Sequence, residues 1–165
     1  MSGTRIYFLS GADSSRFDES LSGVPVFYPA NIARWWPGLA AGPIDAALNW
    51  GANRVYFFVG ANYYRWNPRE NSLEAGYPKP ITGNWAGFAG TGFENGFDDA
   101  GNWGNGKVYF FKGDMYLRMD WNSQSVDAGY PKAISAGWHD LTKTGYGTGS
   151  HAAVTRGNGQ TYMCG

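Results

Sequence analysis

The sequence is poor in cysteine, histidine and charge, and each shortage excludes a class of protein. Cys164 is the one cysteine among 165 residues, so the chain can form neither an intramolecular disulfide nor a cysteine-based zinc site. The histidines are His139 and His151, and no nucleophile, zinc-protease or phosphate-loop motif accompanies them, so we do not expect an enzyme. Charged residues make up 16%, with 13 basic and 13 acidic, which argues against nucleic-acid binding.

Long apolar runs are missing as well. The longest uncharged run of apolar residues, 55–59, is far too short to cross a bilayer. Residues 1–5 lead directly into a strand pattern, without the apolar stretch of a signal peptide. We therefore expect no membrane insertion, and a location in the cytoplasm or outside the cell after release without a classical signal peptide.

Glycine and aromatic residues are abundant instead, and they recur in a long repeat. The chain has 25 glycines and 18% aromatic residues. An apolar stretch with a central tyrosine occurs four times, at spacings of 49, 53 and 53 residues (Tyr7, Tyr56, Tyr109, Tyr162). The three full copies share later landmarks, which are an arginine (Arg16, Arg65, Arg118), a Tyr-Pro pair (28, 77, 130) and a tryptophan (Trp36, Trp85, Trp138). This register indicates one structural unit copied several times.

Each unit contains four short stretches of strand character, separated by turns rich in glycine and asparagine. A small-residue stretch comes first (44–48, 97–101, 150–154), as suits the crowded inner strand of a propeller. Four-stranded sheets repeated every 40–50 residues or so are typical of β-propellers. We predict an all-β propeller of four-stranded blades in one domain, residues 1–165. Its units are at about 1–43, 44–96 and 97–149, with a partial fourth at 150–165.

These motifs resemble the hemopexin-like repeat. The resemblance rests on Asp-Ala-Ala at 45–47, Val-Tyr-Phe-Phe-x-Gly at 55–60, Tyr-Pro at 77–78 and the following Trp85. The phrase Phe-Glu-Asn-Gly-Phe-Asp at 93–98 is most similar to the repeats of legume seed albumins and small microbial relatives. The resemblance implies four blades, about one unit more than the chain carries.

The ends of the chain raise the question of how such a ring closes. Residues 151–154 match an inner strand, and we predict that they supply the missing inner strand of the N-terminal unit, beside residues 5–11. Residues 160–165 then have no partner, so we expect a homo-oligomer, most simply a dimer, formed by strand exchange. The alternative is that the sequence is a piece of a longer protein. Cys164 either forms an intermolecular disulfide where the two copies meet or is a free thiol.

The inner strands suggest a cation in the central channel. Asp45 and Asp98 occupy the same repeat position, and the carbonyls of Ala47, Ala100 and Ala153 would point toward the axis. Oxygen ligands suit Ca²⁺ or Na⁺, and the resemblance supports an ion there. His151 replaces the aspartate in the last copy, which weakens a ring of oxygen ligands on that side of the channel. The alternative is that the aspartates cap backbone amides. No organic cofactor is expected.

A ligand site is suggested by tryptophans at equivalent loop tips. Trp50 follows Asn49, Trp103 follows Asn102, and Arg156 takes this place in the last copy. An aromatic ring beside amides is suited to stacking on a sugar. The alternative is that these tryptophans pack between blades. The tryptophans of the Trp-x-x-Leu/Phe motif are predicted to be core, and the repeated arginines are predicted to be structural.

We therefore predict a non-enzymatic ligand-binding module, in the first place a carbohydrate-binding, lectin-like propeller. The alternatives are a sensor of the seed-albumin kind for a polyamine, haem or metal ion, and a scaffold for another protein. With two histidines, haem has few axial ligands. The partners we expect are a glycan or small molecule and a second copy of the chain.

Overall fold

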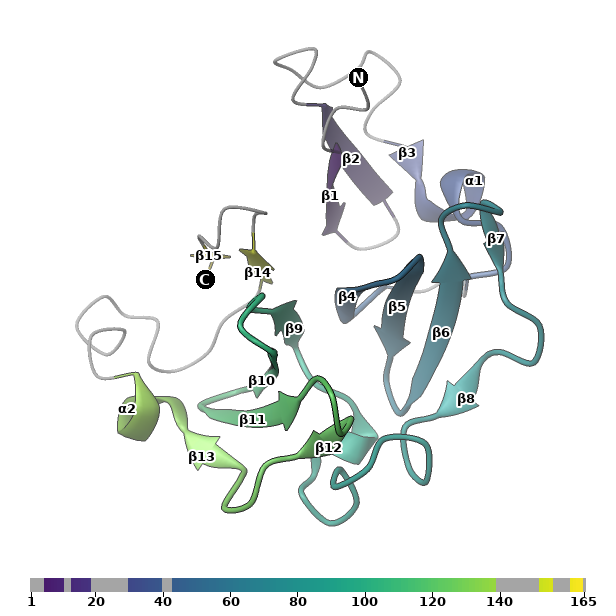
Figure 1. Cartoon of the computed structure of the whole chain (residues 1–165). Coiled ribbons are helices and arrows are strands. Elements are labelled where there is room, and N and C mark those ends of the chain that lie inside the picture. The colour runs from purple at the N-terminus through teal and green to yellow at the C-terminus, as the bar shows by residue number, and fades with distance from the viewer. Residues whose placement is uncertain are drawn as a thin grey trace.

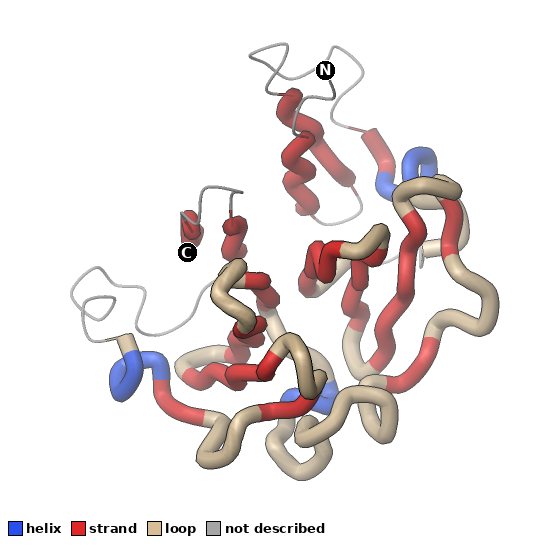
Figure 2. Tube along the Cα trace, viewed as in Figure 1, coloured by secondary structure: helices blue, strands red, loops and turns tan. Residues whose placement is uncertain are grey.

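The computed structural model describes residues 5–10, 13–18, 30–39, 43–138, 152–155 and 161–164. Antiparallel sheets stand around a common centre, with the first strand of a unit innermost and the later strands farther out (Figures 1 and 2). The predicted all-β propeller architecture is therefore confirmed for the described residues. None of their helices is long and apolar enough to cross a membrane.

The second blade, residues 43–89, shows how the repeat folds. Its strands are adjacent in chain order: β4 (Ala46–Gly51), β5 (Arg54–Val59), β6 (Asn62–Asn67) and β7 (Ser72–Leu73), with β8 (Lys79–Pro80) pairing the other end of β6. Ala52 and Asn53 join β4 to β5 with φ of 48° and 58°. Positive φ at both central residues is typical of the tight turn that matches strand twist.

The third blade, residues 97–138, repeats this arrangement. It consists of β9 (Asp99–Asn102), β10 (Lys107–Lys112), β11 (Met115–Asp120), β12 (Ser125–Val126) and β13 (Lys132–Ala133), preceded by the 3₁₀ turn η1 (Phe93–Asn95). The pairing of Tyr56 with Arg65 recurs as the pairing of Tyr109 with Arg118. The 53-residue sequence period is thus also the period of the hydrogen-bonded register.

One helical turn follows the Tyr-Pro stretch in each copy and ends at the tryptophan. The amide of the tryptophan donates to the carbonyl of the isoleucine four residues earlier, at 2.9, 3.1 and 2.8 Å (Trp36–Ile32, Trp85–Ile81, Trp138–Ile134). The first and third of these turns are α1 (Ile32–Trp35) and α2 (Ile134–Gly137). Each turn places its tryptophan against the blade.

The structure does not show the predicted sharing of a strand between the two ends of the chain. The N-terminal sheet contains β1 (Arg5–Ser10), β2 (Asp13–Asp18) and β3 (Ala30–Asn31). The last strands, β14 (Ala152–Thr155) and β15 (Thr161–Cys164), pair with each other and not with β1. Closure of the ring by strand sharing stays a prediction. Strand exchange with a second copy stays a prediction.

Aromatic rings hold the second and third blades together. Phe58 and Phe97 approach with ring centroids 4.6 Å apart, and Phe97 lies 5.1 Å from Phe110. All three belong to one buried cluster that spans both blades. Burying such a ring stabilises the fold by roughly 1.5–3 kcal/mol, which explains how a chain with so few charges and so many aromatics closes its blades.

Candidate functional site

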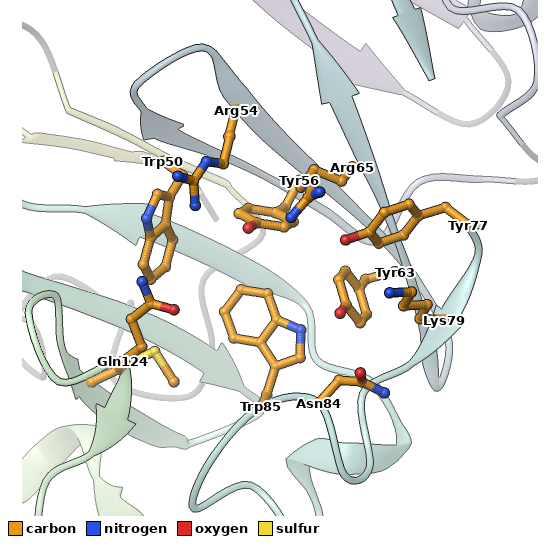
Figure 3. A pocket seen from close by; sticks show the side chains of 11 residues that line it. Trp50, Arg54, Tyr56, Tyr63, Arg65, Tyr77, Lys79, Asn84, Trp85 and Gln124 are labelled. Carbon is orange, nitrogen blue, oxygen red and sulfur yellow. The ribbon is translucent and has the colours of Figure 1, made fainter. Parts of the chain in front are cut away.

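A cavity of about 250 Å³ lies between the second and third blades (Figure 3). The second blade supplies most of its wall, and Met119 and Gln124 of the third blade close one side. Tyr56 comes from β5 and Tyr63 from β6, so neighbouring strands place both rings on the same face of the sheet. The cavity is therefore a product of blade packing.

Trp85 forms the aromatic centre of this cavity. Its ring centroid lies 5.2 Å from Tyr56, 5.5 Å from Tyr63 and 5.8 Å from Trp50, each time edge to face. Trp50 is held in turn by a stacked contact with Trp121 of the third blade, at 4.6 Å and 16°. Rings fixed by several contacts form a rigid platform, which lowers the entropic cost of holding a ligand.

Three cationic side chains line the same cavity: Arg54, Arg65 and Lys79. Arg65 forms an ion pair with Glu74, and this hydrogen bond raises the pKa of Arg65. The guanidinium carbon of Arg65 lies 5.2 Å from the ring centroid of Tyr77, and Lys79 Nζ lies 4.9 Å from the same ring. Tyr77 thus positions two cations at one edge of the cavity.

Two buried N–H donors at the cavity have no hydrogen-bond partner. They are the indole Nε1 of Trp85, whose side chain is 8% exposed, and the guanidinium Nε of Arg65. A buried donor without an acceptor costs about 1–3 kcal/mol, so such groups are rare unless they serve a function. The indole of Trp85 lies on one side of the Tyr56 and Tyr63 rings, and the guanidinium of Arg65 lies beside Tyr56 toward Tyr77 (Figure 3). An acceptor on a ligand would satisfy them.

The tyrosine hydroxyls complete the polar lining. Burial, with the neighbouring Tyr77, raises the pKa of Tyr63 to about 12. Burial also raises the pKa of Tyr77. Both phenols therefore stay protonated throughout the physiological range and can donate hydrogen bonds.

The predicted loop-tip sugar platform is corrected at Trp50. This side chain is 4% exposed, so its ring has no face free for a sugar, and the alternative of packing between blades applies. Asn49 accepts a hydrogen bond from the amide of Gly51 at 2.9 Å and therefore shapes its own turn. The physical reason is alternation along β4, which turns Leu48 and Trp50 inward and Asn49 outward.

The equivalent pair in the third blade behaves in the same way. Asn102 accepts from the amide of Gly104 at 3.0 Å. Trp103 is half-buried and packs against Tyr109 at 4.7 Å and Trp138 at 5.2 Å. Arg156, the last predicted ligand-binding residue, lies outside the described residues.

The aspartates predicted as metal ligands cap turns. Asp45 Oδ2 accepts from the amide of Gly60 at 2.6 Å, and Asp98 Oδ2 accepts from the amide of Gly113 at 2.7 Å. In the part of the chain that the structure describes, no three His, Cys, Asp or Glu side chains gather as a metal site. The alternative reading, capping of backbone amides, thus describes these two carboxylates. The predicted ligands Ala47, Ala100 and Ala153 would contribute backbone carbonyls only.

A buried carboxyl group on an inner strand was not predicted. Asp99 is 5% exposed, and its Oδ1 accepts from the amide of Ala100 at 2.8 Å. Burial raises the pKa of Asp99 to about 7. The repeat aligns it with Ala46 and Ala152, so the sequence alone suggested a small-residue position.

Sequence reasoning missed most of the cavity. It assigned Trp85 to the core and Arg65 to a structural role, and it gave no role to Lys79. The signal was nevertheless present, because each full copy combines an arginine, a Tyr-Pro pair and a tryptophan, and two copies have a lysine after the proline (Lys79, Lys132). Cations at fixed spacing from aromatic residues indicate a shared environment.

The fold and this cavity define a β-propeller with a polar, aromatic pocket between blades. The hemopexin family model matches residues 44–89 and 97–141, and the chain belongs to this family. It is 43% identical to Albumin-2 of Lathyrus sativus over 67 residues, and 42% identical to Albumin-2 of Pisum sativum over 67 residues. Each match covers 40% of this chain, but only 30% and 29% of the respective albumin.

Solved structures agree with the fold along the whole chain. The seed albumin LS24 from Lathyrus sativus superposes with a TM-score of 0.85 at 24% identity. A plant albumin from Cicer arietinum showing hemagglutination gives 0.84 at 22%, and a plant lectin with two metal binding sites from Cicer arietinum gives 0.83 at 24%. In each case 99% of this chain covers 78% of the other. By name these neighbours are albumins and a lectin, and none of the three names is that of an enzyme.

Proposed function

We propose that this protein is a non-enzymatic carbohydrate-binding propeller and that the cavity between the second and third blades is a binding site. The observation that carries the proposal is the unpartnered Nε1–H of buried Trp85 among aromatic rings. Aromatic faces with a few placed donors are how proteins hold small polar ligands. The hemagglutinating and lectin neighbours support this reading.

The size of the cavity favours one end of a glycan. At about 250 Å³ it is smaller than most sites that enclose a drug-sized molecule, which have roughly 300–1,000 Å³. A terminal sugar residue would occupy it while the rest of the chain remains in solvent. A polyamine is disfavoured here, because three cations line the wall and would repel it.

The test is a glycan-array screen of the full chain, repeated with Trp85→Phe. Phenylalanine keeps an aromatic ring and removes the N–H donor, so we expect about tenfold weaker binding of any glycan that the protein recognises. Trp138→Phe is the matched control, since Trp138 has the same place in the third blade. A blank array with folded protein, or equal binding by both variants, would contradict the proposal.

A channel cation is a second candidate, supported by the packing of the inner strands. β4 contacts β9, and β9 contacts β14, so backbone carbonyls of Ala47, Ala100 and Ala153 lie on neighbouring strands. Such oxygens suit Ca²⁺ or Na⁺, which would tie the inner strands together. Elemental analysis of the purified protein and thermal unfolding with and without a chelator test this role. An unchanged midpoint and no bound metal would exclude it.

The predicted dimer needs its own measurement. Light scattering or sedimentation gives the mass of the assembly in solution. A dimer is the expected result, and a monomer over the micromolar range would refute strand exchange.

A further inference from the structure

Charge distinguishes this cavity from a neutral sugar site. Three cationic side chains line it, those of Arg54, Arg65 and Lys79. Glu74 is a carboxylate that pairs with one of them, Arg65. Glu74 is engaged by Arg65, so Arg54 and Lys79 have no carboxylate partner in any ion pair among the described residues. The cavity therefore has a surplus of positive charge beside its aromatic rings.

The unpartnered donors lie within this positive region. Trp85 Nε1 and Arg65 Nε are both buried N–H groups without an acceptor. One of them belongs to a charged guanidinium, for which an anionic acceptor gives roughly twice the strength of a neutral one. The guanidinium of Arg65 and the ammonium of Lys79 both lie against the ring of Tyr77, and this pair of cations suits an oxyanion.

The third blade provides an internal comparison. Its ring contacts are nearly identical, since Lys132 Nζ lies 4.8 Å from the ring of Tyr130, compared with 4.9 Å for Lys79 and Tyr77. Its charges differ. Lys107, which replaces Arg54, donates to Asp120 at 3.0 Å and to Asp127 at 3.0 Å.

The carboxylates of the third blade are firmly engaged. Hydrogen bonds from the amide of Ser123 and from Lys107 lower the pKa of Asp120 to about 2. Asp127 also accepts from Arg118 Nε at 2.5 Å, so the donor equivalent to the unpartnered one of Arg65 is satisfied here. In the third blade, Lys107 and Arg118 are therefore paired with carboxylates of the same blade. In the second blade, Arg54 and Lys79 have no such carboxylate among the described residues.

We infer that the cavity between the second and third blades is selective for an anionic sugar, with a carboxylate or sulfate group held by Arg65 and Lys79. This inference rests on the proposed carbohydrate binding and adds the class of the sugar. The ring of the sugar would lie against the tyrosines, and its oxyanion would accept from the guanidinium of Arg65 and the ammonium of Lys79. The equivalent position in the third blade would not take such a ligand.

Calorimetric titration of the full chain with three probes tests the inference. The probes are methyl β-D-glucuronide, glucose 6-sulfate and methyl β-D-glucoside, where the last is the uncharged counterpart. We expect one or both anionic probes to bind at least about tenfold more tightly than the glucoside, as charge-assisted hydrogen bonds would give. Comparison of the two anions tells carboxylate from sulfate. Affinity should fall as salt is added.

Matched variants locate the site. Lys79→Gln is expected to lower the affinity for the anionic probe about fivefold or more. Lys132→Gln, the same change in the third blade, is expected to leave this affinity unchanged. Equal affinity for charged and uncharged sugars would overturn the inference and leave carbohydrate binding intact. Equal losses in the two variants would also overturn it. Failure of all sugars on the glycan array would instead refute the proposed function.

Discussion

Trp50→Ala gives the most direct test of how the blades are held together. The side chain is 4% exposed and contacts Trp121, Tyr56 and Trp85 at centroid distances of 4.6, 5.7 and 5.8 Å. A buried tryptophan removes about 150–250 Å² from water, which at about 25 cal/mol per Å² corresponds to about 4–6 kcal/mol. Measured truncations of large aromatic residues cost about 3–5 kcal/mol. We therefore expect the free energy of unfolding to fall by about 4 kcal/mol.

The assay is guanidinium denaturation followed by far-UV circular dichroism. A loss of this size is a large part of the total of about 5–15 kcal/mol that a typical domain has, so the midpoint should move far to lower denaturant. Trp103→Ala is the control, because Trp103 has the same repeat position but is half-buried and should lose less. A loss below about 1 kcal/mol for Trp50→Ala would refute the packing argument.

Two further predictions concern acid stability and the contact between blades. Hydrogen bonds from Ser123 and Lys107 lower the pKa of Asp120 to about 2, so its stabilising contribution is present above pH 4 or so and is lost as the pH falls toward 2. Asp120→Asn should be less stable than the wild type in urea at pH 6, with the difference vanishing near pH 2; a pH-independent difference would contradict this. Gly87 has a φ of 84°, and an added Cβ would lie 2.8 Å from Cβ of Val126. Gly87→Ala should lower the free energy of unfolding by about 1–3 kcal/mol, and by more than Gly90→Ala, whose φ is similar but whose surroundings are open.

The repeated strands could be predicted because their information is local. The tyrosine stretch, the turn residues and the Tyr-Pro pair lie within one unit, and the pairing of Tyr56 with Arg65 follows from that unit alone. Ring closure could not be predicted in the same way. β14 pairs with β15, and the motif match between residues 151–154 and an inner strand contains no information about this pairing.

The candidate site was missed for a related reason. Whether Trp50 is buried depends on Trp121, which is 71 residues away and belongs to another blade. Likewise, the charge of the cavity depends on which carboxylates reach the cations after folding. Arg65 meets Glu74 across one turn, whereas Lys107 meets both Asp120 and Asp127. A count of charges along the chain does not show this difference.

Duplication explains how the two blades can share a fold and differ in function. The rings at each site make matching contacts, since Tyr63 and Tyr77 lie 5.4 Å apart, as do Tyr116 and Tyr130. These rings are constrained, because they supply the buried surface that stabilises the blade.

The polar residues at the edge of each cavity are free to vary, because they contribute little to that buried surface. Asn67 of the second blade corresponds to Asp120 of the third, and this one carboxylate helps to hold Lys107. A change from asparagine to aspartate at such a position removes an anion site without disturbing the core. Under the proposed function, a few polar residues at the edge of each cavity would set ligand binding blade by blade, while the aromatic repeat maintains the architecture.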